Sequence, residues 1–341
     1  MPCIRPDISQ GPYNAFFLVT PWPSPPTAAR KETEQGITTV QIRAKRGHLG
    51  LEPKGYINRH QTSSVASLAL GSIDMNSVDL THSSSLPLKL DERRLRLLLG
   101  GDLRSSKPVP RTSDEMREVL LAPDEKAPKI LYWMYRDLHF ARDEAVLRSH
   151  NLRFDATVIR GGLIGREFIK TAGHYHPVMP AYGLSYPEIY EVIHGEAVYL
   201  LQKVRALADP RRVVDVVQVQ ARTGDRVIIP PDYGHVTINP YKTTLVMTNV
   251  TADGFQSEYE PYRRLGGAVY HLVSEGGRPE WLPNKRYINP PPVRTVPVKE
   301  FPQLGLVRGR AMYEALLQNP EAFEFLTKPH RHLGLLNSVL R

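Results

Sequence analysis

Short apolar segments bounded by turn residues follow one another along the middle of the chain. Glycine, proline, aspartate and asparagine separate them, for example at 161–162, 209–210, 223–225 and 239–240, and these residue types favour tight turns. The segments that read as strands are 130–136, 153–160, 166–171, 188–193, 197–203, 213–220, 226–229, 244–249 and 267–273. Many short strands without strand–helix alternation predict an all-β fold, either a sandwich or a small barrel.

Two short helices are expected before this region. Residues 91–99 place three leucines on one side and are followed by two glycines, which is the pattern of a helix and its end. Residues 113–121 predict a second helix, with Ser113 as its N-cap because a serine hydroxyl can accept a hydrogen bond from the first turn.

The end of the chain predicts a further helical region. The proline run at 290–292 forms a stiff linker. Beyond it, 310–318 and 320–327 look helical, and the second has asparagine as its cap and proline at its first position. We therefore expect a folded domain over 86–290 and a tail over 291–341 that packs on the barrel or on a partner subunit.

Residues 1–85 differ from the remainder of the chain. A proline cluster at 21–26 breaks any regular element, and 63–85 is rich in serine, threonine and small residues. Without sustained periodicity, such a segment buries too little apolar surface to offset its ordering entropy. Two interpretations stay open: a disordered extension, or translation of sequence upstream of a true start at Met75.

The composition narrows the class of protein. The 341 residues are 41% hydrophobic and 23% charged, which is typical of a globular chain. No window approaches the roughly 18 uninterrupted apolar residues of a membrane-spanning helix. Cys3 is the only cysteine, so an intrachain disulfide and a thiolate metal cluster are both excluded. A reducing, cytoplasmic setting is therefore expected.

The charge balance is mildly basic. The formal net charge of +9 arises from 44 basic against 35 acidic residues. The excess is spread thinly, without a run of five basic residues, so neither a nucleic-acid partner nor a membrane partner is expected. A weak positive field of this kind suits a phosphorylated metabolite.

Two histidines lie two residues apart, at His174 and His176. On a strand their rings face the same way and could hold a divalent cation. Glu188 opens the next strand and supplies a carboxylate, and Glu191 is the second candidate because it faces the opposite way. His235 follows a strand ended by two prolines and is expected at a strand-to-turn corner. Three histidines and one carboxylate suit Fe(II), Mn(II), Ni(II) or Zn(II), with positions left for a substrate.

The spacing of these residues follows two motifs. Glu188 is followed seven residues later by Gly195, and the second motif has intervals of six, five and four residues between its four positions. Those positions are Gly224, Pro230, His235 and Asn239. The spacing resembles the two cupin motifs, in which three histidines and a glutamate hold one metal inside a small β-barrel. Two positions depart from the general pattern: eleven residues separate His176 from Glu188, and Asp232 stands where a glycine is usual.

A narrower resemblance extends from Arg111 to Tyr287. Gly-His-Tyr-His at 173–176 with Tyr-Pro-Glu-Ile-Tyr-Glu-Val at 186–192 is similar to the cupin-type glucose-6-phosphate isomerases. Further similar segments are 154–159, 165–172, 199–202 and 229–239. In this family a longer interval before the glutamate is tolerated. The resemblance implies a double-stranded β-helix with short flanking helices, and a cytoplasmic homodimer that interconverts glucose 6-phosphate and fructose 6-phosphate in glycolysis and gluconeogenesis.

The resemblance also assigns roles to individual positions. The implied ligands of one divalent metal per chain, with Fe(II) favoured, are His174, His176, Glu188 and His235. The implied phosphate-binding groups are Tyr132, Thr157, Thr171, Gly173 and Tyr259, and the next candidates are Arg166 and Lys170. Glu188 and Tyr190 are the implied catalytic residues. Hydrogen transfer between C1 and C2 is open between a proton route through an enediol and a direct hydride route.

One further departure lies near the end of the barrel. Family members tend to show Gly-His-Asp-Tyr where this chain has Gln-Ser-Glu-Tyr at 256–259, so a role of that histidine in handling the sugar is not transferred. Two other classes stay open: a metal-dependent dioxygenase or decarboxylase, and a non-enzymatic sugar-binding cupin. The phosphate-facing hydroxyls speak against the first class, and the complete ligand set speaks against the second.

Overall fold

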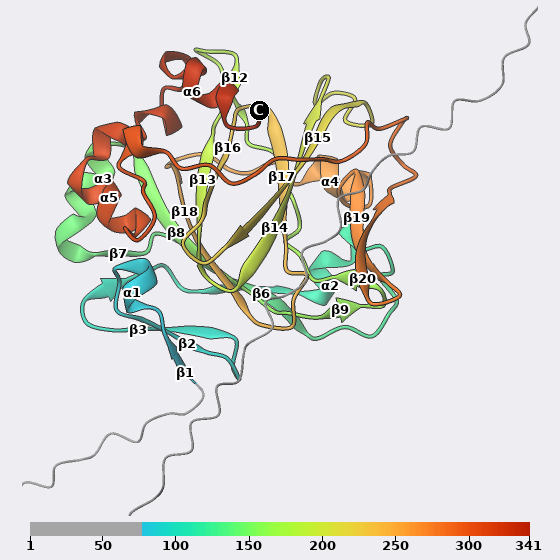
Figure 1. Cartoon of the computed structure of the whole chain (residues 1–341), viewed down its shortest axis with the longest axis horizontal. Coiled ribbons are helices and arrows are strands. Elements are labelled where there is room, and N and C mark those ends of the chain that lie inside the picture. Colours follow the sequence, from blue (N-terminus) through green and yellow to red (C-terminus); the bar gives the residue numbers. More distant parts are fainter. Residues whose placement is uncertain (1–76) are drawn as a thin grey trace, which may run out of the picture. The chain divides into compact units, whose positions relative to one another are not determined.

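The structure is a computed structural model that describes residues 77–341 (Figure 1). The expectations for residues 1–76, including a start at Met75, lie outside the described residues. Two sheets form the centre of the described part, in agreement with the predicted all-β fold. The first has six strands in the order β16 (Arg226–Ile229), β13 (Glu188–His194), β18 (Leu245–Ala252), β8 (Leu152–Ile159), β6 (Ile130–Tyr135) and β5 (Val109–Thr112). The second has four in the order β17 (Tyr233–Ile238), β14 (Glu196–Val204), β15 (Val213–Arg222) and β21 (Arg294–Thr295).

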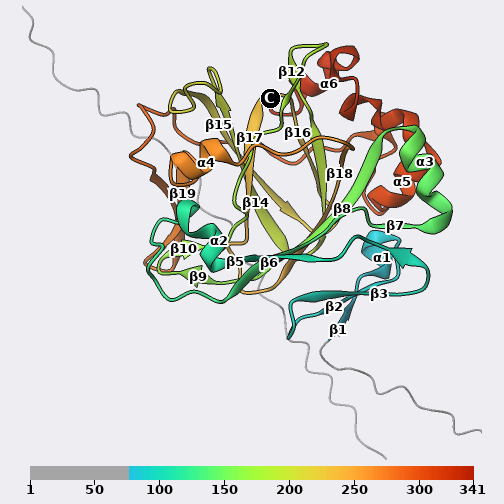
Figure 2. The ribbon, with the colours of Figure 1, turned by 180° about the vertical axis from the view of Figure 1, so that it is seen from behind.

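The two sheets curve around a common interior, which can be followed from both sides in Figures 1 and 2. Tyr199 of β14 shows the contact between them. Its ring centroid lies 5.4 Å from that of Tyr190 on β13, and its hydroxyl donates to Met247 Sδ on β18 at 3.5 Å. The interior between the sheets is therefore the place where inward-pointing side chains of β13 and β18 meet those of β14.

Smaller elements surround the two sheets. A four-stranded sheet has the order β20 (Arg278–Pro283), β19 (Tyr270–Glu275), β10 (Glu167–Phe168) and β9 (Leu163–Ile164). Three further groups are β1 (Ser77–Asp79) with β2 (Leu88–Asp91) and β3 (Arg96–Leu99), β11 (Val178–Met179) with β12 (Leu184–Ser185), and β4 (Leu103–Arg104) with β7 (His139–Phe140). The helices before the tail are α1 (Thr81–Ser84), α2 (Ser113–Met116), η1 (Arg117–Val119), η2 (Ala141–Asp143), α3 (Glu144–Ser149) and α4 (Glu260–Arg264). No helix of the described residues is long and apolar enough to cross a membrane.

The C-terminal tail packs on the outer face of the six-stranded sheet. It contains η3 (Pro302–Leu304), α5 (Met312–Gln318), η4 (Pro320–Leu326), η5 (Pro329–Arg331) and α6 (Leu333–Ser338), so both predicted tail helices are present, the second as a 3-10 helix. Tyr313 packs against Phe154 of β8 with ring centroids 5.0 Å apart. The backbone N–H of Met312 donates to Glu191 Oε2 at 2.9 Å. Because this sheet is covered on both faces, β13 and β18 are buried almost along their whole length.

The predicted helix over 91–99 is wrong. Strands β2 and β3 pair there as an antiparallel hairpin. Asp91 Oδ1 accepts the backbone N–H of Arg94 at 2.9 Å and closes the turn. Leu97 is 4% exposed and Leu98 43% exposed, which is the alternation of a strand rather than the stripe of a helix. The helical spacing of the leucines is therefore a coincidence in a segment too short to show its true period.

Three other boundaries differ from the predictions. Residues 77–85, assigned to the leading segment, form β1 and α1, and β1 pairs with β2. The cap of α2 is Thr112 rather than Ser113: Thr112 Oγ1 accepts from the Glu115 N–H at 3.3 Å, and Glu115 Oε2 accepts from the Thr112 N–H at 2.8 Å. The segment 166–171 contributes only the two-residue strand β10.

Candidate functional site

A pocket opens on the inner face of the six-stranded sheet. Successive side chains of a strand point to opposite faces, so alternate residues of β6, β8, β13 and β18 line the pocket. The lining residues are Tyr132, Met134, Arg136, Arg153, Thr157, Thr171, Ala172, Gly173, His174, His176, Glu188, Tyr190, Met247, Asn249, Thr251, Phe255, Ser257 and Tyr259. Every predicted metal, phosphate and catalytic residue is in this set except His235, whose ring lies next to those of His174 and Tyr190.

The four predicted metal ligands converge. One ligand atom from each of His174, His176, Glu188 and His235 lies within 4.8 Å of all the others. His174 and His235 are neighbours because their backbones form a β-bridge, with N–H···O distances of 3.2 and 3.0 Å. Their ring centroids are 4.4 Å apart. His235 lies inside β17, so the prediction of a corner position is wrong; the turn comes just before this strand.

Asp232 occupies that turn, at the position where a glycine is usual in the cupin motif. Its φ is 68°, in the left-handed region. Aspartate adopts this conformation more readily than most residues because its short side chain bonds locally. The backbone N–H of Asp232 donates to Ser185 Oγ at 2.6 Å, and Asp232 Oδ1 accepts from the Ser185 N–H at 3.3 Å. The departure from the motif therefore keeps the turn that leads into β17.

The surroundings of His174 and His235 favour the neutral imidazole that a cation requires. His176 Nδ1 donates to the carbonyl of Tyr186 at 2.9 Å, which leaves the Nε2 lone pair facing the other ligands. Burial and the rings of His235 and His176 lower the pKa of His174 well below its usual value. Burial also lowers the pKa of His235. Neutral imidazoles beside a carboxylate fit a divalent transition metal.

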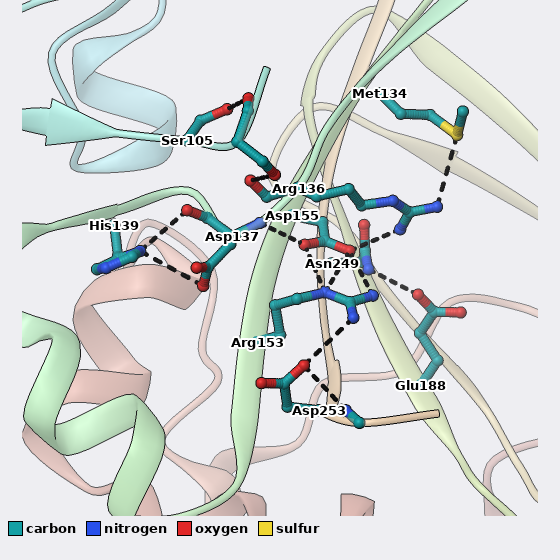
Figure 3. A network of polar contacts seen from close by, with 12 residues as sticks. Ser105, Met134, Arg136, Asp137, His139, Arg153, Asp155, Glu188, Asn249 and Asp253 are labelled. Atoms are coloured by element: carbon teal, nitrogen blue, oxygen red, sulfur yellow. Dashed lines mark hydrogen bonds and ion pairs between the residues drawn. The ribbon is translucent and has the colours of Figure 1, made fainter. Parts of the chain in front are cut away.

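Glu188 is fixed at the start of β13. Its Oε2 lies 3.4 Å from His176 Nε2 and 3.2 Å from His235 Nε2. Asn249 Nδ2 donates to its Oε1 at 2.7 Å, as Figure 3 shows. Burial opposes the negative charge, but the neighbouring rings of His176 and His235 hold the pKa of Glu188 well below its usual range. Sequence reasoning missed Asn249; the signal was an amide side chain inside a fully buried strand.

Tyr190 lies beside the ligand set, as the resemblance implied. Its hydroxyl donates to Glu188 Oε2 at 2.9 Å and lies 3.1 Å from His235 Nε2. Burial, followed by the charge of Glu188, raises the pKa of Tyr190 well above its usual value. The hydroxyl therefore keeps its proton and acts as a hydrogen-bond donor at the edge of the ligand set.

Glu191 points away from the pocket, as the alternation predicted. Arg226 pairs with its Oε1 at 2.6 Å, and Met312 N–H donates to its Oε2. Burial raises the pKa of Glu191 to about 7, although Arg226 works against this shift. Glu191 joins the sheet to the tail and has no contact with the predicted ligands.

The predicted phosphate-binding groups gather in the same pocket. The Ala172 N–H donates to Tyr132 Oη at 3.3 Å, and the Thr237 N–H donates to Thr171 Oγ1 at 3.0 Å. Each hydroxyl oxygen is thus occupied as an acceptor, and its own proton is free for a ligand. The ring centroid of Tyr259 lies 5.3 Å from that of His174. These hydroxyls therefore lie within the pocket that the metal ligands border.

The alternative phosphate candidates lie elsewhere. Arg166 pairs with Glu275 at 2.6 Å on the surface, and Lys170 donates to the carbonyl of Val119 at 2.7 Å in the interior. Neither lines the pocket. Two other arginines do, Arg136 and Arg153, and sequence reasoning missed both because no motif marks them.

Known proteins provide an independent comparison. A family model described as glucose-6-phosphate isomerase matches residues 110–289, more than half of the chain. The glucose-6-phosphate isomerase of Thermococcus gammatolerans is 26% identical over 140 residues, which are 41% of this chain and 67% of that protein. The glucose-6-phosphate isomerase of Pyrococcus furiosus is 28% identical over 115 residues, which are 34% of this chain and 51% of that protein.

Two solved structures share less of their sequence with this chain. An oxalate decarboxylase mutant from Bacillus subtilis is 13% identical with a TM-score of 0.27, over 46% of this chain and 32% of that one. A recombinant oxalate oxidase is 20% identical with a TM-score of 0.21, over 31% and 42% of the two chains. Assignment of the chain to a family therefore depends on the match to the family model. That match spans β5 to β20 and contains all four predicted metal ligands. On that match, the chain belongs to the glucose-6-phosphate isomerase family, in the cupin-type branch represented by its Thermococcus and Pyrococcus relatives.

Proposed function

We propose that this chain is a metal-dependent aldose–ketose isomerase that interconverts glucose 6-phosphate and fructose 6-phosphate and acts as a homodimer. The observation that supports the proposal best is the position of three histidines and one carboxylate beside a set of free hydroxyl donors in one pocket. The first group suits a cation that binds two sugar oxygens, and the second suits a phosphate. Family membership favours the same reaction.

His174, His176, Glu188 and His235 would hold the metal, for which we propose Fe(II). When bound, a divalent metal polarises the substrate carbonyl and stabilises negative charge that develops on it. Asn249 keeps one carboxylate oxygen of Glu188 in place, so that the other oxygen faces the histidines. Tyr190 donates a hydrogen bond at that oxygen.

The direct test combines metal analysis with a coupled assay on fructose 6-phosphate. We expect about one divalent metal per chain and activity that chelation removes and metal restores. Activity in a verified metal-free sample would contradict the metal dependence. Oxygen uptake without isomerisation would instead assign the site to another reaction, and a mass in light scattering of one chain would contradict the dimer.

Glu188→Gln is expected to lower both metal retention and activity, because an amide is a neutral and weaker ligand than a carboxylate. Glu191→Gln is the matched control, three residues away on the opposite face of β13. Glu191→Gln is expected to lower the free energy of unfolding by about 1–3 kcal/mol, because the amide can accept only one of the two hydrogen bonds that Glu191 accepts. Metal content, initial rates and thermal denaturation separate the two effects, and the reverse ranking would mean that the wrong face of β13 has been assigned.

Removing a phosphate-facing hydroxyl is expected to weaken substrate binding without loss of metal. For Thr157→Val, Thr171→Val and Tyr259→Phe, the loss of one hydrogen bond to a charged group predicts a KM for fructose 6-phosphate raised about 10- to 100-fold. Thr248→Val is the control, because the Thr248 hydroxyl is buried without a partner and is outside the pocket lining. If all three variants keep the wild-type KM, the phosphate binds elsewhere.

A further inference from the structure

Arg136, the residue directly after β6, lines the wall of the pocket. Of the residues that line the pocket, two are arginines and none is a lysine. The phosphate-facing groups of the proposed function are hydroxyls and a backbone position, which carry no charge. A phosphate monoester brings one to two negative charges near neutral pH, with a second pKa of about 6. Hydroxyl donors alone leave that charge uncompensated.

Contacts with Asp155 and Met134 fix the direction in which the Arg136 side chain extends. Its Nη1 donates to Asp155 Oδ2 at 2.6 Å, and its Nη2 lies 3.5 Å from Met134 Sδ. Figure 3 shows the side chain extended between these two partners. Met134 is paired with Thr157 across β6 and β8. The guanidinium therefore reaches back along β6 toward the level of Thr157, one of the phosphate-facing residues.

The carboxylate that pairs with Arg136 is shared with a second arginine. Asp155, which is 1% exposed, also pairs with Arg153, whose Nε lies 3.0 Å from Oδ1. Two guanidiniums thus share one buried carboxylate. Arg153 is also 3.4 Å from Asp253, whose other neighbour, Arg148, has a closer partner in Asp137 at 2.5 Å. Arg136 therefore shares its carboxylate partner with a second arginine, so Asp155 neutralises its charge only in part.

The charge of Arg136 is permanent. Burial by itself would lower the pKa of Arg136, but the carboxylate of Asp155 outweighs burial and raises this pKa above its usual value. The charge acts inside the pocket, since Glu188 and Tyr259 are among the groups that interact with it electrostatically. In a partly desolvated site such a cation interacts more strongly with an anion than it would in water.

We propose that Arg136 binds the phosphoryl group of the substrate and makes the site selective for doubly charged phosphate esters. Asp155 and Arg153 act as positioning residues that hold the guanidinium between Met134 and the pocket. This inference rests on the proposed function for the identity of the substrate, and it adds a charged contact to the set of hydroxyls. Esters with a single negative charge, such as sugar sulfates, are expected to bind less well for lack of the second charge.

The test uses the full chain loaded with metal, in wild-type form and as Arg136→Gln, Arg136→Lys and Arg160→Gln. Arg160 is the matched control, because it donates to the carbonyl of Ile130 at the end of β8 and does not line the pocket. Calorimetry gives the Kd of glucose 6-phosphate and of glucose 6-sulfate, and initial rates give KM and kcat for fructose 6-phosphate.

For Arg136→Gln we expect Kd and KM for the phosphate esters to rise about 10- to 100-fold, the size of one lost charge-assisted hydrogen bond. The preference for phosphate over sulfate should fall about tenfold, with metal content unchanged and kcat affected less than KM. Arg136→Lys keeps the charge but not the forked geometry, so it should recover part of the affinity.

Three results would overturn the inference: a wild-type Kd in Arg136→Gln, an equal loss for phosphate and sulfate esters, or an equal loss in Arg160→Gln. The outcome is separable from that of the proposed function, because the Kd measurements need no turnover. Arg136-dependent binding of glucose 6-phosphate without isomerisation would refute the reaction and support the contact. Isomerisation with a KM indifferent to Arg136 would refute the contact alone.

Discussion

Replacing His174, His176 or His235 by alanine is expected to remove bound metal and isomerase activity together. Each change deletes one of four ligands whose donor atoms lie within 4.8 Å of one another. A metal that polarises a carbonyl contributes several kcal/mol to catalysis, so we expect a fall in kcat/KM on the order of a thousandfold. Elemental analysis and the coupled assay with fructose 6-phosphate are made on the same preparation, so that metal content and rate can be compared directly.

The control for these variants is His150→Ala. His150 lies at the end of α3, where its Nδ1 contacts the carbonyl of Val146 at 2.9 Å, and it is outside the pocket. The His150→Ala variant measures the effect of removing an imidazole that lies outside the proposed metal site. A histidine variant that keeps full activity after verified loss of metal would contradict the mechanism, and one that keeps its metal would remove that residue from the ligand set.

Gly173→Ala is expected to be the most destabilising single-methyl change near the site. Gly173 has a φ of 77°, and a Cβ there would lie 2.6 Å from the ring of Tyr262 and 2.6 Å from Val236 Cγ2. The left-handed backbone costs about 1–2 kcal/mol and overpacking about 1–3 kcal/mol, which together predict a loss of about 2–5 kcal/mol. Because His174 is the next residue, we expect metal affinity to fall and KM to rise together with the loss of stability.

Gly224→Ala separates the two contributions. Gly224 has a φ of 90°, but apart from its chain neighbours no atom lies within 4 Å of the place that a methyl group would take there. Only the backbone cost of about 1–2 kcal/mol is therefore expected. Thermal or urea denaturation of both variants measures the difference. Equal losses would show that the chain around Gly173 can move to make room, and that the close approach of the backbone to the pocket is not fixed.

The strands that form the pocket were predictable because each is a compact apolar segment between turn residues. Strand β17 was not, since its residues Tyr233–Ile238 follow two prolines and include a glycine and a histidine. The hairpin β2–β3 was mistaken for a helix because four-residue strands are shorter than the spacing needed to tell the two periods apart. In both cases the conformation is determined by strand pairing, with the neighbouring strand for β2 and β3 and with β14 for β17, and the local sequence pattern does not show it.

Pocket residues that belong to no sequence motif could not be predicted either, and the reason is a different one. Asn249 and Arg136 matter through contacts with Glu188 and Asp155, which are 61 and 19 residues away in sequence. Strand β18, which contains Asn249, is buried along its whole length. Its sequence therefore shows no alternation that would tell which side chains face the pocket.

By itself, the sequence determined the all-β class and marked the three histidines and the glutamate, whereas the hydroxyl residues of the pocket were implied by the family resemblance. It could do so because turn residues and motif spacing are local properties of the chain. Only the tertiary structure decided that Asn249 fixes Glu188, that Glu191 anchors the tail, and that Arg136 rather than Arg166 or Lys170 faces the pocket. The physical reason is that these roles depend on which buried faces of distant strands meet, and burial on both faces removes the polarity pattern that would have revealed it.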